Sequence, residues 1–275
     1  MIVRNSSSEK FDIIILAGQS NAESSGKGET PTPWQPREDI MILKNDFVSG
    51  VGKTEEGFDY VVIDAEKDAH VEIADEWKGE NARGMFALNF AKRYANTCLE
   101  SGRKVLIVHT AVGGTGFARK HWGVGDCLYN RMIDMCDSAL KMGKDNKVVA
   151  VLWHQGEHDV PETDEFDFDY SYGIYREKFY ALIKSVRDRY GKYIPVIAGG
   201  FCNEWASKWT KQCKAVIDAI KNVGSELGEF GFVETDDLKS NNQMNGDGDE
   251  IHFCRASLGV LGERYFDEYE KIINK

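Results

Sequence analysis

Phe11-Asp-Ile-Ile-Ile-Leu-Ala17, followed at once by Gly18-Gln19-Ser20-Asn21, is the stretch that decides the fold. A short run rich in isoleucine, ended by a polar turn, is typical of a strand buried on both faces. Four similar runs occur at 104–109, 147–153, 194–198 and 230–234. Segments with helical spacing of apolar residues lie between or after them, at 83–101, 128–142, 170–190, 204–226 and 256–273. This alternation predicts a three-layer α/β/α sandwich with a central parallel sheet of about five strands.

The composition is that of a globular chain with an acidic balance. Of 275 residues, 42% are hydrophobic and 29% charged, and 34 basic against 45 acidic residues give a formal net charge of −11. Nucleic acid and anionic membrane surfaces are therefore poor partners. We expect one domain over 1–275, with an irregular insertion at about 24–80 that holds three of the five prolines and has room for a hairpin.

The cysteines and the N-terminal residues indicate a compartment. The six cysteines form no CxxC pair and show no regular spacing, so we expect reduced thiols. No apolar stretch reaches the roughly 18 residues of a membrane span. Residues 1–10 lack the apolar core of a signal peptide. We expect a cytoplasmic enzyme, or a secreted one if a leader has been removed.

Polar clusters follow the predicted strands at the points where those strands end. The clusters are 18–21 (GQSN), 110–116 (TAVGGTG), 154–159 (HQGEHD) and, after a loop rich in Gly, Asn and Asp, 249–252 (DEIH). Parallel strands present their carboxyl ends at one edge of the sheet, which is where ligands bind in such folds. The sequence therefore predicts that all four clusters contribute to one site.

Ser20, Asp249 and His252 have the residue types of a nucleophile, an orienting carboxylate and a general base. A serine on a tight turn after a strand can expose its hydroxyl, and a carboxylate three residues from a histidine can hold one ring nitrogen. Each residue also has a plain structural explanation. Ser20 can cap a helix, and the 249–252 segment can be a solvated loop.

Gly114 and Gln155 are candidates for stabilising a negatively charged oxygen. The Gly113-Gly114 pair lets the backbone approach a ligand, and the Gln155 amide could donate a hydrogen bond from the end of its strand. A simple turn and a buried structural hydrogen bond are the alternatives. Glu157 could support the loop, or could replace Asp249 as the group that orients His252.

His154, Glu157 and His158 fit the H-x-x-E-H pattern of one class of zinc peptidases. That chemistry needs both histidines on one face of a regular helix. Here the first histidine directly follows a predicted strand, Gly156 interrupts the motif and Pro161 follows soon after. A helix at this place would be weak, so the pattern does not favour zinc.

The four clusters, in this order, resemble the SGNH hydrolase superfamily. More narrowly they resemble its sialate O-acetylesterase-like branch, which includes the acetylxylan esterases of carbohydrate esterase family 6. The segments 122–132 and 262–265 fit that branch too. The resemblance implies a flavodoxin-like fold and removal of acetyl groups from sugars, without metal or cofactor. It implies that Ser20 is the nucleophile, His252 the base and Asp249 its orienter, with Ser20, Gly114 and Gln155 forming the oxyanion hole.

The substrate is only weakly encoded. We expect an acetylated sugar or oligosaccharide, such as a xylo-oligosaccharide or a sialic acid. Sugars stack well on aromatic faces, so Trp122 is the first candidate contact, with Gln19 and Asn21 beside the nucleophile. The other candidate tryptophans are Trp34, Trp77, Trp205 and Trp209. Core packing explains any of these equally well. A lipase or thioesterase of the same superfamily and a non-catalytic sugar-binding module are the remaining alternatives.

Overall fold

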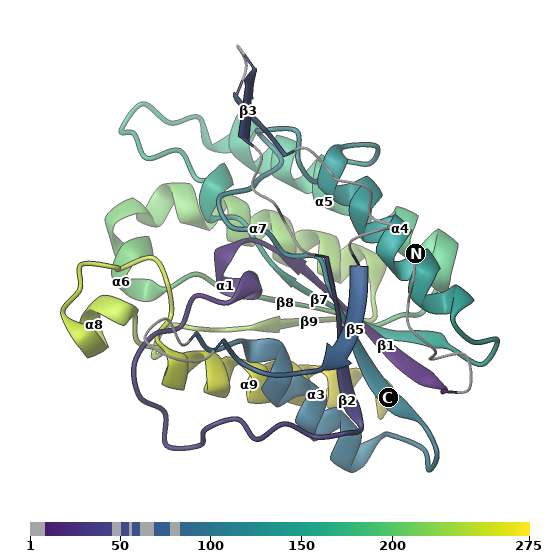
Figure 1. Ribbon diagram of the computed structural model, residues 1–275. Coiled ribbons are helices and arrows are strands. Elements are labelled where there is room, and N and C mark those ends of the chain that lie inside the picture. Colours follow the sequence, from purple (N-terminus) through teal and green to yellow (C-terminus); the bar gives the residue numbers. More distant parts are fainter. Residues whose placement is uncertain (1–8, 46–50, 55–56, 61–68, 78–82) are drawn as a thin grey trace.

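The computed structural model describes residues 9–45, 51–54, 57–60, 69–77 and 83–275. Seven strands form one sheet in the order β5-β2-β6-β1-β7-β8-β9 (Figure 1). The strands are β1 (Phe11–Gly18), β2 (Ile40–Asn45), β5 (Ala69–Ile73), β6 (Lys104–His109), β7 (Lys147–His154), β8 (Val196–Gly199) and β9 (Phe230–Val233). All neighbours pair in parallel except β5, which runs antiparallel to β2. The predicted fold class is confirmed.

Helices cover both faces of this sheet. One face carries α3 (Phe86–Thr97) and α9 (Arg255–Ile273), and the other carries α4 (Cys127–Lys141), α5 (Phe168–Tyr190) and α7 (Thr210–Leu227) (Figure 1). Strand β1 is buried on both faces, which explains why its sequence is continuously apolar. Ile14 and Leu16 join the core under α3 and α9, whereas Ile13 and Ile15 join the core on the opposite face. All four side chains are fully buried, as period-two alternation in a central strand requires.

The sheet has two strands more than the five expected, and both come from the segment at about 24–80. β2 adds a parallel strand beside β6, and β5 closes that edge. β5 was not predicted because an edge strand needs only one buried face and reads as a mixed polar segment. The expected hairpin is present as β3 (Val51–Thr54) paired antiparallel with β4 (Gly57–Tyr60).

Short helices gather at the end of the sheet where the parallel strands terminate. They are α1 (Ser20–Glu23), η2 (Glu157–Asp159), α6 (Asn203–Ala206), η3 (Ser207–Trp209) and α8 (Asn241–Asn245). Figure 1 shows α1, α6 and α8 on this side of the molecule. The helix expected over 204–226 is therefore broken into α6, η3 and α7, because the backbone of Trp209 leaves helical geometry at φ −127° and ψ 41°.

The six cysteines form no disulfide, and the described helices are short or polar. All six cysteines are free, and Cys136, Cys202, Cys213 and Cys254 are buried. Within the described parts of the chain, every helix is too short or too polar to cross a membrane.

The end of β1 makes an unusually close backbone approach to β7. Gly18 pairs with His154, and its φ of +133° is a conformation that L side chains rarely adopt. A Cβ atom at this position would lie 2.1 Å from the carbonyl oxygen of His154. Only glycine lets β1 reach this far before the chain turns into α1, so Gly18 sets the position of Ser20.

We expect Gly18→Ala to lower the free energy of unfolding by about 3 kcal/mol or more, because backbone strain and a steric clash add. Denaturant unfolding measures this loss. Gly102→Ala is the control, since Gly102 also has a positive φ (79°) but has no atom within 4 Å of the added Cβ. Backbone strain alone should cost about 1–2 kcal/mol there. Equal losses at the two positions would contradict the close approach.

Candidate active site

Ser20, His252 and Asp249 form one continuous hydrogen-bonded chain. The Oγ atom of Ser20 lies 2.8 Å from Nε2 of His252, and Nδ1 of His252 lies 2.7 Å from Oδ1 of Asp249. Ser20 and His252 are 232 positions apart in the chain. All three side chains are only partly exposed. The structure therefore assembles a hydroxyl, an imidazole and a carboxylate in the order that activates a serine.

The loop that carries Asp249 and His252 is held by backbone hydrogen bonds. α8 begins with a capping box in which Ser240 and Gln243 satisfy each other's backbone groups. The N–H of Asn241 then donates to the carbonyl of His252 (2.8 Å), and the N–H of Asn242 donates to that of Asp249 (2.9 Å). This folds the loop back on α8 and brings the carboxylate and the imidazole to the same side.

Asp249 lies among hydrogen-bond donors from three parts of the chain. Its Oδ2 atom accepts from Asn241 and from Nζ of Lys27, each at 3.0 Å, while Oδ1 accepts from His252. Burial by itself would raise the pKa of Asp249. The hydrogen bonds from Asn241, Lys27 and His252 outweigh burial and lower this pKa below its ordinary value. The carboxylate is thus kept ionised and can stabilise a positively charged imidazole.

The loop after β6, which holds Gly113 and Gly114, lies close to Ser20. Gly114 adopts a φ of +72° in the loop after β6, and the preceding residue donates its N–H to Glu23 at 2.8 Å. A Cβ on Gly113 would lie 3.5 Å from that of Ser20, so this loop lies against the nucleophile turn. The N–H groups of Ser20 and Gly114 have no hydrogen-bond partner among the described residues. They can serve as donors to an oxyanion.

Gln155 differs from the expectation that its amide points at the reacting atom. The side chain is 1% exposed, and its amide nitrogen lies 2.7 Å from Asp159 Oδ2, 3.1 Å from the Thr115 carbonyl and 3.2 Å from Gln19 Oε1. Both amide hydrogens are therefore already used. Gln155 therefore holds the loop that contains Gly113 and Gly114 against the end of β7. This is the buried structural hydrogen bond that was the alternative to a role in the oxyanion hole.

Gln19 and Asn21 also differ from their expected role as substrate contacts. Both are buried, at 1% and 0% exposure. The Gln19 side chain accepts from Gln155 and from the His158 N–H (3.2 Å). Because both side chains are buried and are held by internal hydrogen bonds, they offer little surface that a sugar could contact. They instead hold the residues on either side of Ser20.

Asn21 connects the nucleophile turn with the histidine loop. Its Nδ2 atom donates to the Ile251 carbonyl (3.2 Å) and to Glu157 Oε1 (2.8 Å), and its Oδ1 atom accepts from the Phe253 N–H (3.1 Å). One amide thus contacts the residues before and after His252. The Glu157 carboxyl group accepts from Asn21, whereas it is Asp249 that contacts the imidazole of His252.

Trp122, the tryptophan first expected to contact sugar, belongs to the core. It is fully buried, its indole N–H donates to Thr115 Oγ1 (2.9 Å), and its ring packs edge-on against Trp153 with ring centroids 5.4 Å apart. Its loop does follow the glycine pair, but the ring points inward because the space over β7 must be filled. Trp77, by contrast, is 55% exposed.

The H-x-x-E-H residues do not lie on a helix. His154 is the last residue of β7, and Glu157 and His158 belong to the single turn η2. His154 is fully buried and faces Tyr265, and burial lowers its pKa to about 3. Over the ranges that the structure describes, no three His, Cys, Asp or Glu side chains are grouped so that they could hold a metal ion. The helical zinc arrangement is therefore wrong for this segment.

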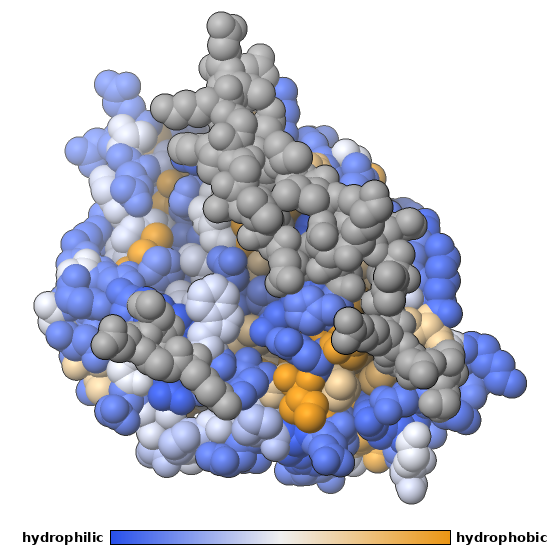
Figure 2. Space-filling model, in the orientation of Figure 1, coloured by the Kyte–Doolittle hydropathy of each residue, from blue (hydrophilic) through white to orange (hydrophobic). Residues whose placement is uncertain are grey.

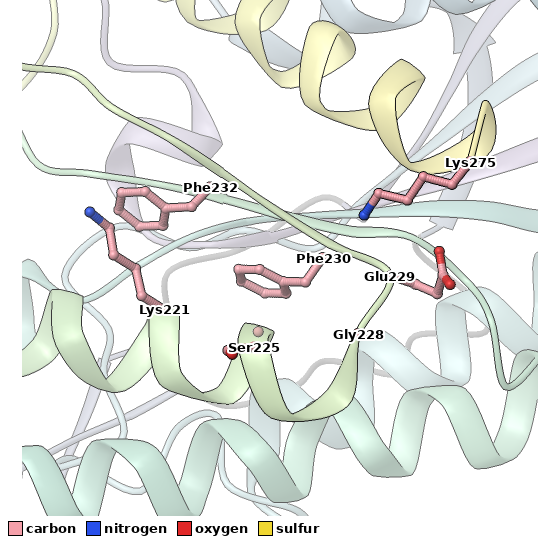
Figure 3. A pocket seen from close by; sticks show the side chains of 8 residues that line it. Lys221, Ser225, Gly228, Glu229, Phe230, Phe232 and Lys275 are labelled. Carbon is pink, nitrogen blue, oxygen red and sulfur yellow. The ribbon is translucent and has the colours of Figure 1, made fainter.

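A cavity of about 340 Å³ lies away from Ser20 (Figure 3). It is formed where α7 ends and β9 begins. Phe230 and Phe232 line it together with Lys221 and Lys275. Parallel strands place their amino ends opposite the edge that carries the catalytic clusters, so this cavity is separate from the candidate active site.

Three residues that support this site through hydrogen bonds were not predicted from the sequence. Lys27 and Asn241 bind Asp249, and Tyr265 binds His154. Lys27 is an ordinary surface type, and Asn241 lies in a loop where asparagine is common. No spacing connects either with Asp249, so only their positions in space show the function.

The sheet order and the turn after β1 are those of an SGNH hydrolase-like fold. The chain belongs to the family described as "Carbohydrate esterase, sialic acid-specific acetylesterase", whose model matches residues 10–271. The resemblance to the sialate O-acetylesterase-like branch is thereby confirmed.

Individual relatives agree with this membership. The "Probable carbohydrate esterase At4g34215" of Arabidopsis thaliana is 31% identical over 189 residues, which cover 64% of this chain and 62% of that protein. The solved structure of NanS superposes with a TM-score of 0.70 at 17% identity, over 97% of this chain and 98% of that one. The solved structure of the Arabidopsis thaliana protein AT4G34215 superposes with a TM-score of 0.69 at 21% identity, over 94% of this chain and 98% of that one. These two structures share the fold.

We expect Trp122→Ala to lower the free energy of unfolding by about 3–5 kcal/mol, because it leaves a cavity in the core. Trp77→Ala should change it by no more than about 0.5 kcal/mol, as for most exposed side chains. Chemical denaturation of both variants measures the difference. A small loss at Trp122 would show that its ring is not part of the core.

Proposed function

We propose that this protein is a serine esterase that removes O-acetyl groups from carbohydrates by two-step acyl transfer. The observation that supports this most is the Ser20–His252–Asp249 chain, with distances of 2.8 and 2.7 Å. Membership of a carbohydrate esterase family supports the class of substrate. Acetylated xylo-oligosaccharides, sialic acids and related acetylated sugars are the candidates.

The first step transfers the acetyl group to the enzyme. His252 accepts the proton of the Ser20 hydroxyl through Nε2 as the oxygen attacks the acetyl carbonyl carbon. The carbonyl oxygen becomes negative, and the N–H groups of Ser20 and Gly114 donate to it. The tetrahedral intermediate then expels the sugar oxygen, which takes the proton from His252. The ionised Asp249 stabilises the imidazolium throughout.

The second step releases acetate. A water molecule gives its proton to His252 and attacks the acyl-enzyme carbonyl. The same two N–H groups hold the second oxyanion, and the Ser20 oxygen leaves with the proton returned by His252.

The family favours a polar substrate. A long acyl chain needs an extended apolar groove, whereas a sugar needs hydrogen bonds and an aromatic face. In Figure 2 the described residues of the face in view are mostly hydrophilic, with only small apolar patches between them. Membership of a carbohydrate esterase family favours an acetylated sugar over the lipase and thioesterase alternatives.

Replacing the nucleophile and its remote carboxylate tests the mechanism. Ser20→Ala should lower kcat by roughly 10⁶-fold. Asp249→Asn should lower it by roughly 10⁴-fold, because an amide favours the wrong imidazole tautomer. Acetate release from acetylated xylo-oligosaccharides, sialic acids and p-nitrophenyl acetate measures both. Sugar binding that persists without any turnover by the wild type would instead support the non-catalytic module.

Trp77 is the tryptophan that we propose as the aromatic face for the sugar. Its carbonyl accepts from the Arg83 N–H (3.2 Å), and the next N–H, that of Gly84, donates to the Gly26 carbonyl (2.8 Å). Gly26 lies just after α1. The neighbouring Glu76 binds Arg255, three residues beyond His252. An exposed ring is therefore held beside both loops that carry the catalytic residues.

We expect Trp77→Ala to raise KM for an acetylated oligosaccharide by roughly three- to tenfold, the effect of losing one stacking contact. The effect on p-nitrophenyl acetate, which has no sugar ring, should be smaller. Tyr193→Ala is the matched control, because Tyr193 is 70% exposed but precedes β8 at the opposite edge of the sheet. If both variants changed KM for the oligosaccharide equally, Trp77 would have no special role.

A further inference from the structure

Lys27 places a positive charge on the carboxylate that binds the catalytic histidine. Its Nζ atom lies 3.0 Å from Oδ2 of Asp249, and Oδ1 of the same carboxylate lies 2.7 Å from Nδ1 of His252. Among the described residues, Lys27 and His252 are the basic side chains that pair with Asp249. Consecutive hydrogen bonds therefore connect a cation, a carboxylate, an imidazole and the Ser20 hydroxyl.

The backbone of Lys27 is held on both sides, which distinguishes this contact from an ordinary surface ion pair. Its N–H donates to Oδ1 of Asn241 (2.8 Å), and its carbonyl accepts from the N–H of Arg255 (2.9 Å). The amide nitrogen of Asn241 in turn donates to Asp249 Oδ2 at 3.0 Å. Exposed ion pairs contribute little because two mobile side chains must be ordered. Here the lysine extends from a fixed backbone, and the side chains of Lys27 and Asp249 are only 33% and 16% exposed.

We propose that Lys27 is a positioning residue whose charge sets the lower end of the pH range in which this enzyme is active. The cation holds the carboxylate of Asp249 with Oδ1 toward His252. It also opposes a positive charge on the imidazole, so His252 remains an unprotonated base at a lower pH than it would beside Asp249 alone. The inference rests on the proposed esterase function for its effect on activity, but not for its effect on the imidazole.

Lys27 keeps its charge because it contacts two carboxylates. Nζ also lies 2.9 Å from Oδ2 of Asp247. The hydrogen bond to Asp247, the largest effect, and the one to Asp249 raise the pKa of Lys27, and together they outweigh partial burial. Other charged side chains on the elements around this loop have partners of their own. The contacts are Lys208 with Glu250, Arg255 with Glu76, Glu204 with Ser240 and Asn242, and Glu157 with Asn21.

Lys27→Met tests the proposal, because methionine keeps an unbranched apolar stem and removes the charge. The acidic limb of the kcat/KM profile, which reports protonation of the free base, should move to higher pH by about 0.5–1 unit. Below the limb, kcat/KM should therefore be roughly three- to tenfold lower than in the wild type, whereas at the plateau it should change less than about twofold. Hydrolysis of p-nitrophenyl acetate between about pH 5 and pH 9 measures the profile.

Two further variants separate the charge of Lys27 from its hydrogen bonds. Lys27→Gln keeps a donor without the charge, so its acidic limb should move in the same direction as that of Lys27→Met. Lys27→Arg keeps the charge, so its limb should coincide with that of the wild type. A purely structural role would instead lower kcat/KM by the same factor at every pH. That outcome, or an arginine variant that behaves like Lys27→Met, would contradict the proposal.

Lys208→Met is the matched control. Lys208 is 53% exposed and binds Glu250, the residue after Asp249. The substitution removes a positive charge from the same loop region, but the carboxylate that binds the imidazole is that of Asp249. Because exposed charges are screened with distance, the acidic limb should stay within about 0.2 unit of the wild type. If Lys208→Met and Lys27→Met moved the limb equally, the Lys27 charge would have no special role.

The titration of the His252 ring, followed by NMR, is independent of turnover. The ring signal is identified by its absence from His252→Asn. Its midpoint should lie about 0.5–1 unit higher in Lys27→Met than in the wild type. An unchanged midpoint would overturn the proposal even if the wild type hydrolysed acetylated sugars. A raised midpoint in a protein that released no acetate would instead support the effect of Lys27 and contradict the esterase function.

Discussion

A single buried amide, that of Asn21, makes the two halves of the catalytic chain depend on each other. It follows Ser20 directly, and its oxygen and nitrogen bind the backbone on both sides of His252. Because the Asn21 side chain is fully buried, water competes little for its amide group, and losing one of these hydrogen bonds leaves an unsatisfied polar group. The hydrogen bonds of Asn21 to the backbone of Ile251 and Phe253 therefore help to set the distance between Ser20 and His252.

The sheet supplies the frame in which this amide can act. β1 is central, with β6 and β7 on either side, and each of the three strands ends at the same edge. The turn after β1 carries Ser20, the turn after β6 carries Gly114, and the turn after β7 carries Gln155 and Glu157. Close backbone packing at Gly18 brings the first and third of these turns together. Such packing leaves the turns after β1 and β7 little freedom to move relative to one another.

Several polar residues that look alike in sequence have different functions in the structure. Gln19, Asn21 and Gln155 were candidates for direct contact with substrate or oxyanion, but all three are buried and braced. Among the tryptophans, Trp122 is buried in the core whereas Trp77 is exposed. A residue type and a position after a strand indicate that a side chain is near the site. Whether it points into the site depends on neighbours from distant parts of the chain.

The sequence by itself determined the alternation of strands and helices, the edge of the sheet where the polar clusters meet, and the residue types of the nucleophile, base and orienting carboxylate. These follow from local periodicity and from the rule that parallel strands end together. The three-dimensional structure was needed to show that Asp249 rather than Glu157 binds His252, that β2 and β5 extend the sheet, and that Asn21 connects the two loops. The physical reason is that hydrogen-bond direction and burial are properties of groups brought together in space, and residues up to 232 positions apart supply them here.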